Sequence, residues 1–364
     1  MNRNLEFWRQ FDFVLLAITA LLVGIGILVI RSATLDAIDT DIIARVPVQI
    51  QYAIIGFLLI FAIAALDYRI LSGLSFWLYL TSIILLALVP FIGQEGAGGA
   101  QRWISFGILI QPSEISKILL ILTLAHFFAT RLDQMNRFRT VILSLIHIGI
   151  PAALIFIQPD LGTTIVIGVI WFALAWGAGL RIRHIALLVM IGILLLPLFF
   201  SLLEGYQINR LRIFLFQEID PDAQYNIDQA LISIGSGGIS GKGYTEGTQN
   251  RGRFLRVRHT DFIFSVLAEE FGMVGSLTVI ALIGMVLWRI LKAAQYAPDA
   301  MGSLICYGVA AVIFFQTTVS IGMNLNLMPV TGLTLPFISS GGTSLLSTMA
   351  GIGLAESVVM RSRK

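Results

Sequence analysis

The chain has 364 residues, of which 57% are hydrophobic and only 12% are charged, and its formal net charge is +3. A soluble domain usually carries about 25% charged residues, so the composition excludes an ordinary water-soluble protein. A membrane-spanning helix needs about 20 apolar residues, and the apolar residues present would supply about ten such helices. The single cysteine, Cys306, cannot form an internal disulfide, and no Cys and His residues have the spacing of a zinc site.

Continuous apolar runs follow one another along the chain, without the two-residue alternation of a membrane barrel. The first run lacks a small-residue cleavage site, so we expect an anchor rather than a removable signal peptide. We predict an all-α integral membrane protein, a polytopic bundle of about ten transmembrane helices. It would form a single domain over residues 1–364, with a long extracytoplasmic loop over residues 204–261. The runs are Phe13–Ile30, Val46–Leu66, Leu71–Ile92, Ile115–Thr130, Val141–Ile157, Leu161–Leu180, Ile185–Leu203, Phe262–Ile290, Leu304–Leu325 and Leu345–Met360.

Basic residues gather in alternate connections between these runs. Cytoplasmic connections carry an excess of Lys and Arg, so we expect both termini and this set of connections on the cytoplasmic side. The other short connections and adjoining helix starts hold fewer basic residues, namely Arg31, Arg45, Arg102 and Lys117. No basic stripe with interleaved aromatic residues predicts binding to nucleic acid. The predicted cytoplasmic set is Arg3, Arg9, Arg69, Arg131, Arg137, Arg139, Arg181, Arg183, Arg289, Lys292, Arg361, Arg363 and Lys364.

Ionisable side chains within or beside the spans are the first candidates for function, because their burial in a membrane is costly. Glu114 and Lys117 are three residues apart and therefore lie on one helical face. Their spacing is compatible with a structural ion pair at the start of the helix or with a charged wall of an outward-facing cavity. The sequence leaves both interpretations open.

Other charged residues have weaker individual signals. Asp160 follows a proline in a short connection, and by itself it would be read as a helix N-cap. Arg102 precedes Trp103, a common arrangement at a membrane interface. Glu269 and Glu270 fall within the eighth apolar run, so we expect at least one of them to pair internally or to face water.

The predicted long loop contains a glycine-rich stretch over residues 233–252. It includes Lys242 but lacks the glycine spacing and the following Ser or Thr of a Walker A loop. Its glycines would allow tight turns or a close approach to a bulky ligand. The cationic run that follows meets Asp261 at the membrane edge, which suits a substrate with an anionic head and an apolar tail, or else contact with lipid headgroups. That run consists of Arg251, Arg253, Arg256, Arg258 and His259.

The segment Pro329–Ser344 combines two prolines with three glycines between apolar runs. Non-helical backbone at membrane depth is tolerated where protein buries it or water lines it, so we expect a broken or re-entrant segment. It can offer backbone groups and hydroxyls, among them Thr331 and Ser339. With the charged motifs it lies on the predicted outer side, whereas a proton-coupled transporter would place its acids near mid-bilayer.

Taken in order along the chain, these polar motifs resemble those of the shape, elongation, division and sporulation (SEDS) family. The short tails and the segment His259–Phe264 are more similar to its elongation branch than to its division branch. Three positions depart from the family pattern: Arg256-Val257 replace an expected Pro-Glu, Ser240 replaces an aromatic residue, and Ser340 stands where one is common. The matching motifs are Gln101–Ile104, Gln111–Glu114 with Lys117, Gln158–Thr163, Gln229–Leu231 with Gly235–Gly238, Gly247–Gln249, His259–Phe264 with Ala268–Glu270, and Pro329–Gly332 with Leu335–Phe337.

This resemblance implies a peptidoglycan glycosyltransferase that polymerises lipid II during cell elongation, on the outer face of the bacterial cytoplasmic membrane and with a class B penicillin-binding protein. It assigns Asp261 as the essential loop aspartate, for which we expect the role of general base, with polyprenyl diphosphate as leaving group. The leaving group also implies a divalent cation, Mg²⁺ or Mn²⁺, although no ligand cluster identifies a site. The expected substrate-binding residues are Arg102, Glu114, Lys117, Asp160, Lys242, Arg258, His259, Thr260, Thr331 and Ser339.

Other functions share parts of this pattern. A lipid II flippase or exporter would bind the same substrate without bond chemistry, but alternating access needs functional residues that face both sides. A ligase of lipid-linked sugars is the nearest enzymatic alternative. A membrane scaffold is disfavoured by the costly charges.

Overall fold

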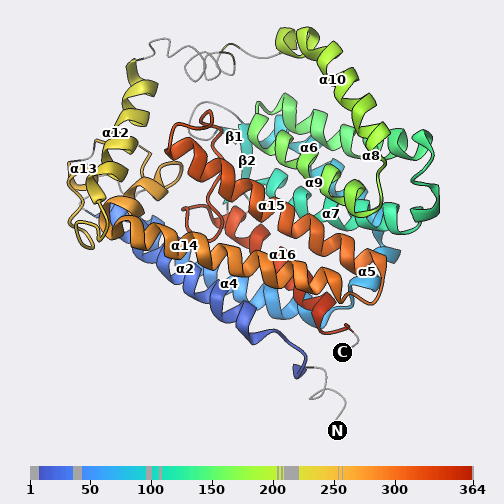
Figure 1. Cartoon of the computed structure of the whole chain (residues 1–364), viewed down its shortest axis with the longest axis horizontal. Coiled ribbons are helices and arrows are strands. Elements are labelled where there is room, and N and C mark those ends of the chain that lie inside the picture. The colour runs from blue at the N-terminus through green and yellow to red at the C-terminus, as the bar shows by residue number, and fades with distance from the viewer. Residues whose placement is uncertain are drawn as a thin grey trace.

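The computed structural model describes residues 8–35, 43–95, 101–105, 109–202, 205, 208, 221–252, 254–255 and 257–362. They form a helical bundle, and the first and last described residues, Trp8 and Ser362, belong to segments at the same end of it (Figure 1). Several residues singled out above lie outside the described part: Arg3, Arg253, Arg256, Arg363, Lys364 and much of the first part of the predicted 204–261 loop.

Every predicted apolar run forms a helix, which confirms the all-α membrane architecture. Among the described residues, seven helices are long and apolar enough to cross a membrane. The apolar parts of α9 and α10 are shorter, and α16 is the most completely buried helix of the bundle. The ten helices that correspond to the predicted apolar runs are α2 (Phe13–Thr34), α4 (Arg45–Ala65), α6 (Ser75–Ile92), α7 (Pro112–Ala129), α8 (Phe138–Ile157), α9 (Leu161–Gly177), α10 (Ile182–Leu202), α14 (Ile263–Gln295), α15 (Ala300–Asn324) and α16 (Gly342–Val359).

Polar residues at the helix starts fix where these helices begin. The Asp12 carboxylate accepts from the first backbone N–H groups of α2, and Asp299 does the same for α15. Pro112 occupies the first turn of α7, where its missing N–H costs nothing. Short helices fill the connections: α5 (Tyr68–Gly73) precedes α6, while α12 (Pro221–Gly237) and α13 (Thr248–Arg251) lie in the predicted long loop.

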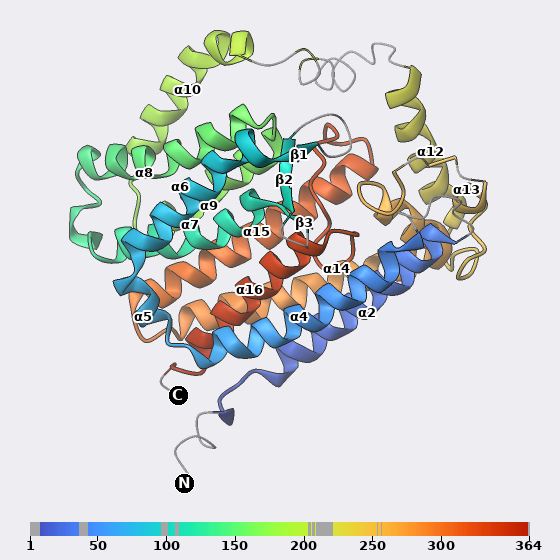
Figure 2. The same cartoon turned by 180° about the vertical axis from the view of Figure 1, so that it is seen from behind.

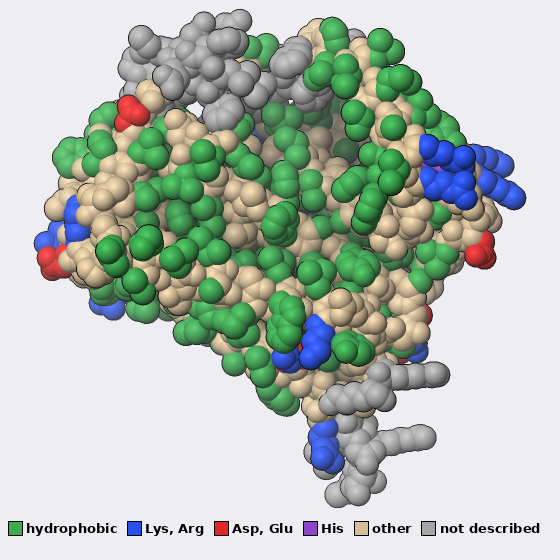
Figure 3. All heavy atoms as spheres, in the orientation of Figure 1, with side chains coloured by type: hydrophobic (Ala, Val, Ile, Leu, Met, Phe, Trp, Pro, Cys, Tyr) green, Lys and Arg blue, Asp and Glu red, His purple; other side chains and the backbone are tan. Residues whose placement is uncertain are grey.

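Helix α16 occupies the centre of the bundle, where it packs against α4, α15 and α7 (Figure 2). Small residues allow this close packing. A Cβ added at Gly353 would lie 3.0 Å from the Ile63 side chain and 3.2 Å from the Ile60 backbone of α4. Hydrophobic side chains are spread over the face of the bundle that Figure 3 shows, as expected where the neighbouring medium is lipid.

A small antiparallel sheet covers one end of the bundle. Its strands are β1 (Gln94–Glu95), β2 (Gln101–Ser105) and β3 (Leu109–Ile110), in the order β1-β2-β3. Trp103 pairs with Gln94, and Ile104 pairs with Ile110. The strand β3 leads directly into the first turn of α7, so the sheet fixes where that turn begins.

The glycine-rich stretch packs against a kink in α14. Gly272 has a φ of 66° and interrupts the helical backbone. The segment that follows α12 takes up the freed hydrogen bonds, because the N–H groups of Met273 and Val274 donate to the carbonyl oxygens of Gly238 and Ile239 at 2.9 and 3.1 Å. A Cβ at Gly241 or Gly272 would collide with the opposing backbone. The predicted tight turns are therefore present, and the close approach seen here is to protein backbone, whereas a close approach to a bulky ligand stays a prediction.

The predicted break between the last two helices is confirmed. The chain is non-helical from the end of α15 at Asn324 to the start of α16 at Gly342. This connection, called the buried loop below (residues 325–341) after its second half, places Leu335, Phe337 and Ile338 in the core, whereas Leu327 in its first half is 69% exposed. Within it, the N–H groups of Ile338 and Ser339 donate to the Leu335 carbonyl oxygen at 3.2 and 3.0 Å.

Candidate functional site

Asp261 lies in a short loop, residues 257–262, directly before α14; we call it the Asp261 loop. Its side chain is half-buried. The carbonyl oxygen of Asp261 accepts a hydrogen bond of 2.8 Å from Asn324 Nδ2, at the end of α15. The same Asn324 side chain, fully buried, accepts from the Ser265 N–H and hydroxyl at 3.1 and 2.7 Å. One amide thus joins the aspartate to the first turn of α14.

The buried loop holds the two preceding residues. The Ser339 hydroxyl donates to the Thr260 carbonyl at 2.9 Å, and the Ser340 N–H donates to the His259 carbonyl at 3.0 Å. Gln49 of α4 in turn donates to the Ser339 carbonyl at 3.4 Å. Three successive carbonyl groups are therefore anchored, and the backbone of the Asp261 loop is held by elements far apart in the sequence.

The surroundings of the Asp261 loop are positively charged. Arg258 is buried and donates its Nε–H to the Ala33 carbonyl at the end of α2. Burial, together with the charges of Arg45 and Arg258, lowers the pKa of His259 to about 4. The imidazole is consequently neutral at physiological pH, and the cationic character of this region comes from the two arginines.

Glu114 and Lys117 form the expected ion pair, with 2.8 Å between Glu114 Oε2 and Lys117 Nζ. Both side chains are almost completely buried, at 7% and 1% exposure. The Ser347 hydroxyl of α16 donates to the Glu114 carbonyl at 2.9 Å, which joins this first turn of α7 to the central helix. A buried pair of opposite charges is costly to break because each charge depends on the other.

Asp160 caps α9, as its position in the sequence predicted, by accepting from the Thr163 N–H and hydroxyl. It also accepts from Gln111 Nε2 at 3.2 Å, and the Gln111 N–H donates to the Thr343 hydroxyl of α16. Arg102 of β2 donates to the carbonyl groups of Gln158 and Pro159, immediately before the cap. These contacts place the Asp160 turn beside the starts of α7 and α16.

Lys242 belongs to a different set of contacts. Its ammonium lies 2.8 Å from Glu269 Oε1 and 2.7 Å from the Thr248 hydroxyl. The neighbouring Glu270 accepts from Ser32 of α2 and from Asn250 Nδ2. The prediction that at least one of Glu269 and Glu270 pairs internally is thereby confirmed. The same contacts tie the glycine-rich stretch to α14 and α2.

The structure therefore distributes the predicted residues over three connected groups. The first group consists of His259, Thr260 and Asp261 together with Ser339 of the buried loop. Thr331 of the same loop lies against the start of α9, where its carbonyl oxygen would be 2.9 Å from a Cβ added at Gly162. The second group contains Arg102, Glu114, Lys117 and Asp160, and the third contains Lys242. Arg258 adjoins the third group through α2, because the neighbouring α2 residues Ser32 and Ala33 contact Glu270 and Arg258.

Sequence reasoning missed three residues of this arrangement: Asn324, Gln49 and Arg45. Asn324 and Gln49 are amides at the ends of apolar helices, a signal that was available but unspecific. Arg45 is the first residue of α4, and its sequence position indicated only a basic residue in a connection between apolar runs. Among the residues that the structure describes, no group of three or more His, Cys, Asp or Glu side chains could hold a metal ion.

The chain matches known proteins over nearly its full length. The family profile FTSW_RODA_SPOVE, described as "Cell cycle protein", matches residues 13–364. Peptidoglycan glycosyltransferase MrdB of Escherichia coli (strain K12) is 37% identical, covering 97% of this chain and 95% of that protein. Stage V sporulation protein E of Bacillus subtilis (strain 168) is 34% identical, covering 97% and 98%.

Solved structures agree with this match. A chain of a peptidoglycan synthase complex, solved to show how polymerization and crosslinking are coordinated, superposes with a TM-score of 0.83 at 33% identity, covering 96% of this chain and 97% of that one. The rod shape determining protein RodA of Thermus thermophilus superposes with a TM-score of 0.72 at 32% identity, covering 97% and 98%. The sequence match, the shared fold and the polar groups around Asp261 agree: the chain belongs to the FtsW, RodA and SpoVE family of polytopic membrane proteins.

Proposed function

We propose that this protein is a peptidoglycan glycosyltransferase that polymerises lipid II during cell elongation. Relatives that match almost the whole chain are named peptidoglycan glycosyltransferases. The observation that carries the proposal is the anchoring of Asp261: three successive backbone carbonyls of its loop are held by Asn324, Ser339 and Ser340. A backbone held in this way limits the positions open to the Asp261 carboxylate, and proton transfer by a positioned carboxylate typically contributes about 10²–10⁴-fold to a rate.

In the proposed reaction, the Asp261 carboxylate takes the proton from the acceptor sugar hydroxyl. The hydroxyl oxygen forms a bond to the anomeric carbon of the donor, and the bond from that carbon to the diphosphate breaks. Polyprenyl diphosphate leaves with the electron pair. A direct displacement of this kind predicts inversion, from an α-linked donor to a β-linked glycan.

The charges near the Asp261 loop suit a diphosphate leaving group. Arg258 and Arg45 lie close enough to His259 to lower its pKa, and positive groups stabilise the charge that grows on the departing oxygen. A divalent cation is part of the proposal as a companion of the diphosphate, because Mg²⁺ is commonly held by one or two carboxylates together with substrate phosphates. The proton transfer to Asp261 does not depend on this cation.

We further propose that the Asp261 loop faces the outside of the cytoplasmic membrane, that both termini face the cytoplasm, and that a class B penicillin-binding protein is the partner. The distribution of Lys and Arg along the chain supports this orientation. The similarity to a chain of a synthase complex that couples polymerization to crosslinking supports the partner.

The test is polymerisation of lipid II by the purified chain in detergent, alone and with its penicillin-binding protein, followed by gel separation of glycan strands. We expect strands with the wild type and none with Asp261→Asn. Asp228→Asn is the matched control because Asp228 is exposed on α12, and it should retain full activity. A flippase would give no strands with any variant, since a detergent solution has no second compartment.

Full activity of a folded Asp261→Asn variant would contradict the role of Asp261 as base. Absence of strands from the wild type, with and without the partner, would contradict the glycosyltransferase proposal itself.

A further inference from the structure

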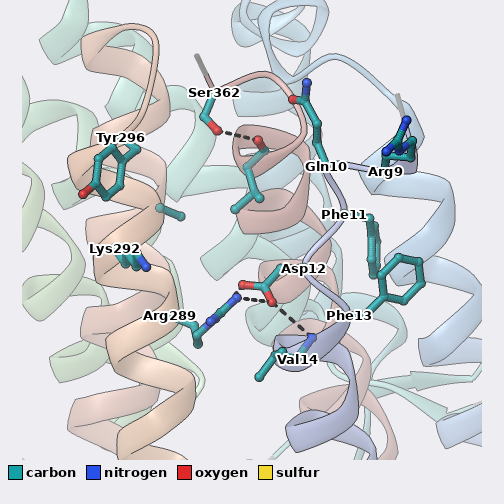
Figure 4. A pocket seen from close by; sticks show the side chains of 12 residues that line it. Arg9, Gln10, Phe11, Asp12, Phe13, Val14, Arg289, Lys292, Tyr296 and Ser362 are labelled. Carbon is teal, nitrogen blue, oxygen red and sulfur yellow. Dashed lines mark hydrogen bonds and ion pairs between the residues drawn. The ribbon is translucent and has the colours of Figure 1, made fainter. Parts of the chain in front are cut away.

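The end of the bundle remote from the Asp261 loop contains a cavity of about 680 Å³. The segment before α2, the last turns of α14 and the end of α16 form its walls (Figure 4). Sites for small ligands usually measure about 300–1,000 Å³, so its size suits a headgroup. The glycosyl transfer proposed above gives this cavity no role.

Helix lengths show that the cavity and the Asp261 loop lie near opposite membrane surfaces. Helix α2 has 22 residues, which corresponds to about 33 Å at 1.5 Å per residue, close to the roughly 30 Å of a bilayer's hydrocarbon core. Its first residues line the cavity, whereas Ala33 at its other end contacts Arg258. Helices α14 and α16 also begin beside the Asp261 loop and end at the cavity.

The cavity is positively charged. Arg9, Arg289 and Lys292 line it, and Asp12 is the single carboxylate among the lining residues. Asp12 pairs with Arg289, and its N–H donates to the buried Glu356 at 3.0 Å, so this side of the cavity is fixed. Among the described residues, no carboxylate pairs with Arg9 or Lys292, which stand on opposite sides of the cavity (Figure 4).

Apart from Gln10 and Ser362, the remaining walls are apolar. Phe11, Val14 and Val359 contribute hydrophobic surface. Two further lining residues, Phe13 and Tyr296, are 61% and 59% exposed. Aromatic side chains gather at membrane interfaces. A cationic cavity with apolar walls at the interface matches an acidic headgroup that is attached to acyl chains better than it matches a small soluble anion.

We propose that this cavity binds the headgroup of an anionic phospholipid. Arg9 and Lys292 contact the phosphate from two sides, and the acyl chains lie against Phe13 and Val14. Since the cavity and the Asp261 loop occupy opposite ends of α2, α14 and α16, the proposal stands independently of the glycosyl transfer.

The test measures lipid binding to the delipidated full-length protein in detergent by native mass spectrometry. Phosphatidylglycerol is compared with phosphatidylcholine, which has no net charge. We expect the tightest phosphatidylglycerol site to bind about 30-fold more weakly in Arg9→Gln/Lys292→Gln, because each basic residue near the surface contributes about fivefold. Arg9→Lys/Lys292→Arg keeps both charges and should retain binding, which separates lost charge from lost folding.

The matched control is Arg139→Gln/Arg181→Gln, which removes two exposed cations that do not line the cavity. It should bind phosphatidylglycerol like the wild type. The proposal is overturned if the wild type does not prefer phosphatidylglycerol or if the control variant weakens binding equally. It is also overturned if inorganic phosphate binds as tightly as the lipid, because the ligand would then be a soluble anion.

Discussion

At the scale of single residues, the site depends on buried polar groups whose partners lie far away along the chain. Asn324 reaches across 63 residues to Asp261, and Gln49 reaches across 290 residues to Ser339. A buried group that loses its hydrogen-bond partner costs about 1–3 kcal/mol, so these amides keep the Asp261 loop in one conformation.

The ion pair of Glu114 and Lys117 allows a test of its two interpretations. We expect Lys117→Met to lower the free energy of unfolding by about 3–5 kcal/mol, because the Glu114 carboxylate is left buried without its cation. The double variant Glu114→Gln/Lys117→Met should recover most of that loss, as measured by thermal unfolding in detergent. We nevertheless expect it to make no glycan strands, since the family resemblance predicts that the pair takes part in substrate binding. A stable and active double variant would show that the pair is structural only.

His259 gives a prediction for the effect of pH. Its pKa of about 4 in the folded protein lies below the ordinary value of 6.5, so the unfolded chain binds a proton first as the pH falls. His259 therefore contributes stability above about pH 6.5 that is lost between pH 6.5 and 4, on the order of 3 kcal/mol at most. Unfolding midpoints measured across this range should fall more steeply for the wild type than for His259→Gln. Parallel curves would show that His259 does not cause the dependence.

At the scale of elements, the kink in α14 is stabilised by a second glycine. Gly241 and Gly272 both have positive φ values, 79° and 66°, and their backbones are in direct contact. This contact places the carbonyl groups of Glu269 and Glu270 where Lys242 and Gly243 donate to them, both at 3.0 Å. The start of α14, which follows Asp261, therefore depends on a loop that precedes it in the sequence.

Replacing Gly272 by Ala should lower the unfolding free energy by about 2 kcal/mol or more, because a Cβ would overlap the Gly241 backbone in a strained conformation. Gly235→Ala is the control: Gly235 lies in α12 with no atom within 4 Å of an added Cβ, and alanine favours a helix by about 1 kcal/mol. The stabilities of the two variants are compared by thermal unfolding in the same detergent. Equal stability of the two would contradict the proposed contact.

At the scale of the whole molecule, the bundle presents two chemically different ends, one with the Asp261 loop and one with the cationic cavity. Cys306 is fully buried, so the wild type should resist a membrane-impermeant maleimide. We expect Asp228→Cys to react in intact spheroplasts and Arg139→Cys to react only after permeabilisation. The opposite pattern would reverse the proposed orientation and place the Asp261 loop in the cytoplasm.

The sequence by itself determined the helices, because an apolar run that must satisfy its backbone inside a membrane has few alternatives. It also placed Glu114 and Lys117 on one helical face, since a spacing of three residues fixes neighbours within one helix, and it predicted the break before α16, which its prolines and glycines require. The family was identified from the order of the polar motifs, and the role of Asp261 was predicted from the same resemblance.

Only the tertiary structure decided which polar groups meet. The pairing of Lys242 with Glu269, the amides that hold the Asp261 loop, the contact of Gly241 with Gly272, and the cationic cavity all join segments that are separate in the sequence. The physical reason is that hydrophobicity and helical spacing act over a few residues. Contacts between helices depend instead on how the whole bundle packs, and most of its surface is uniformly apolar.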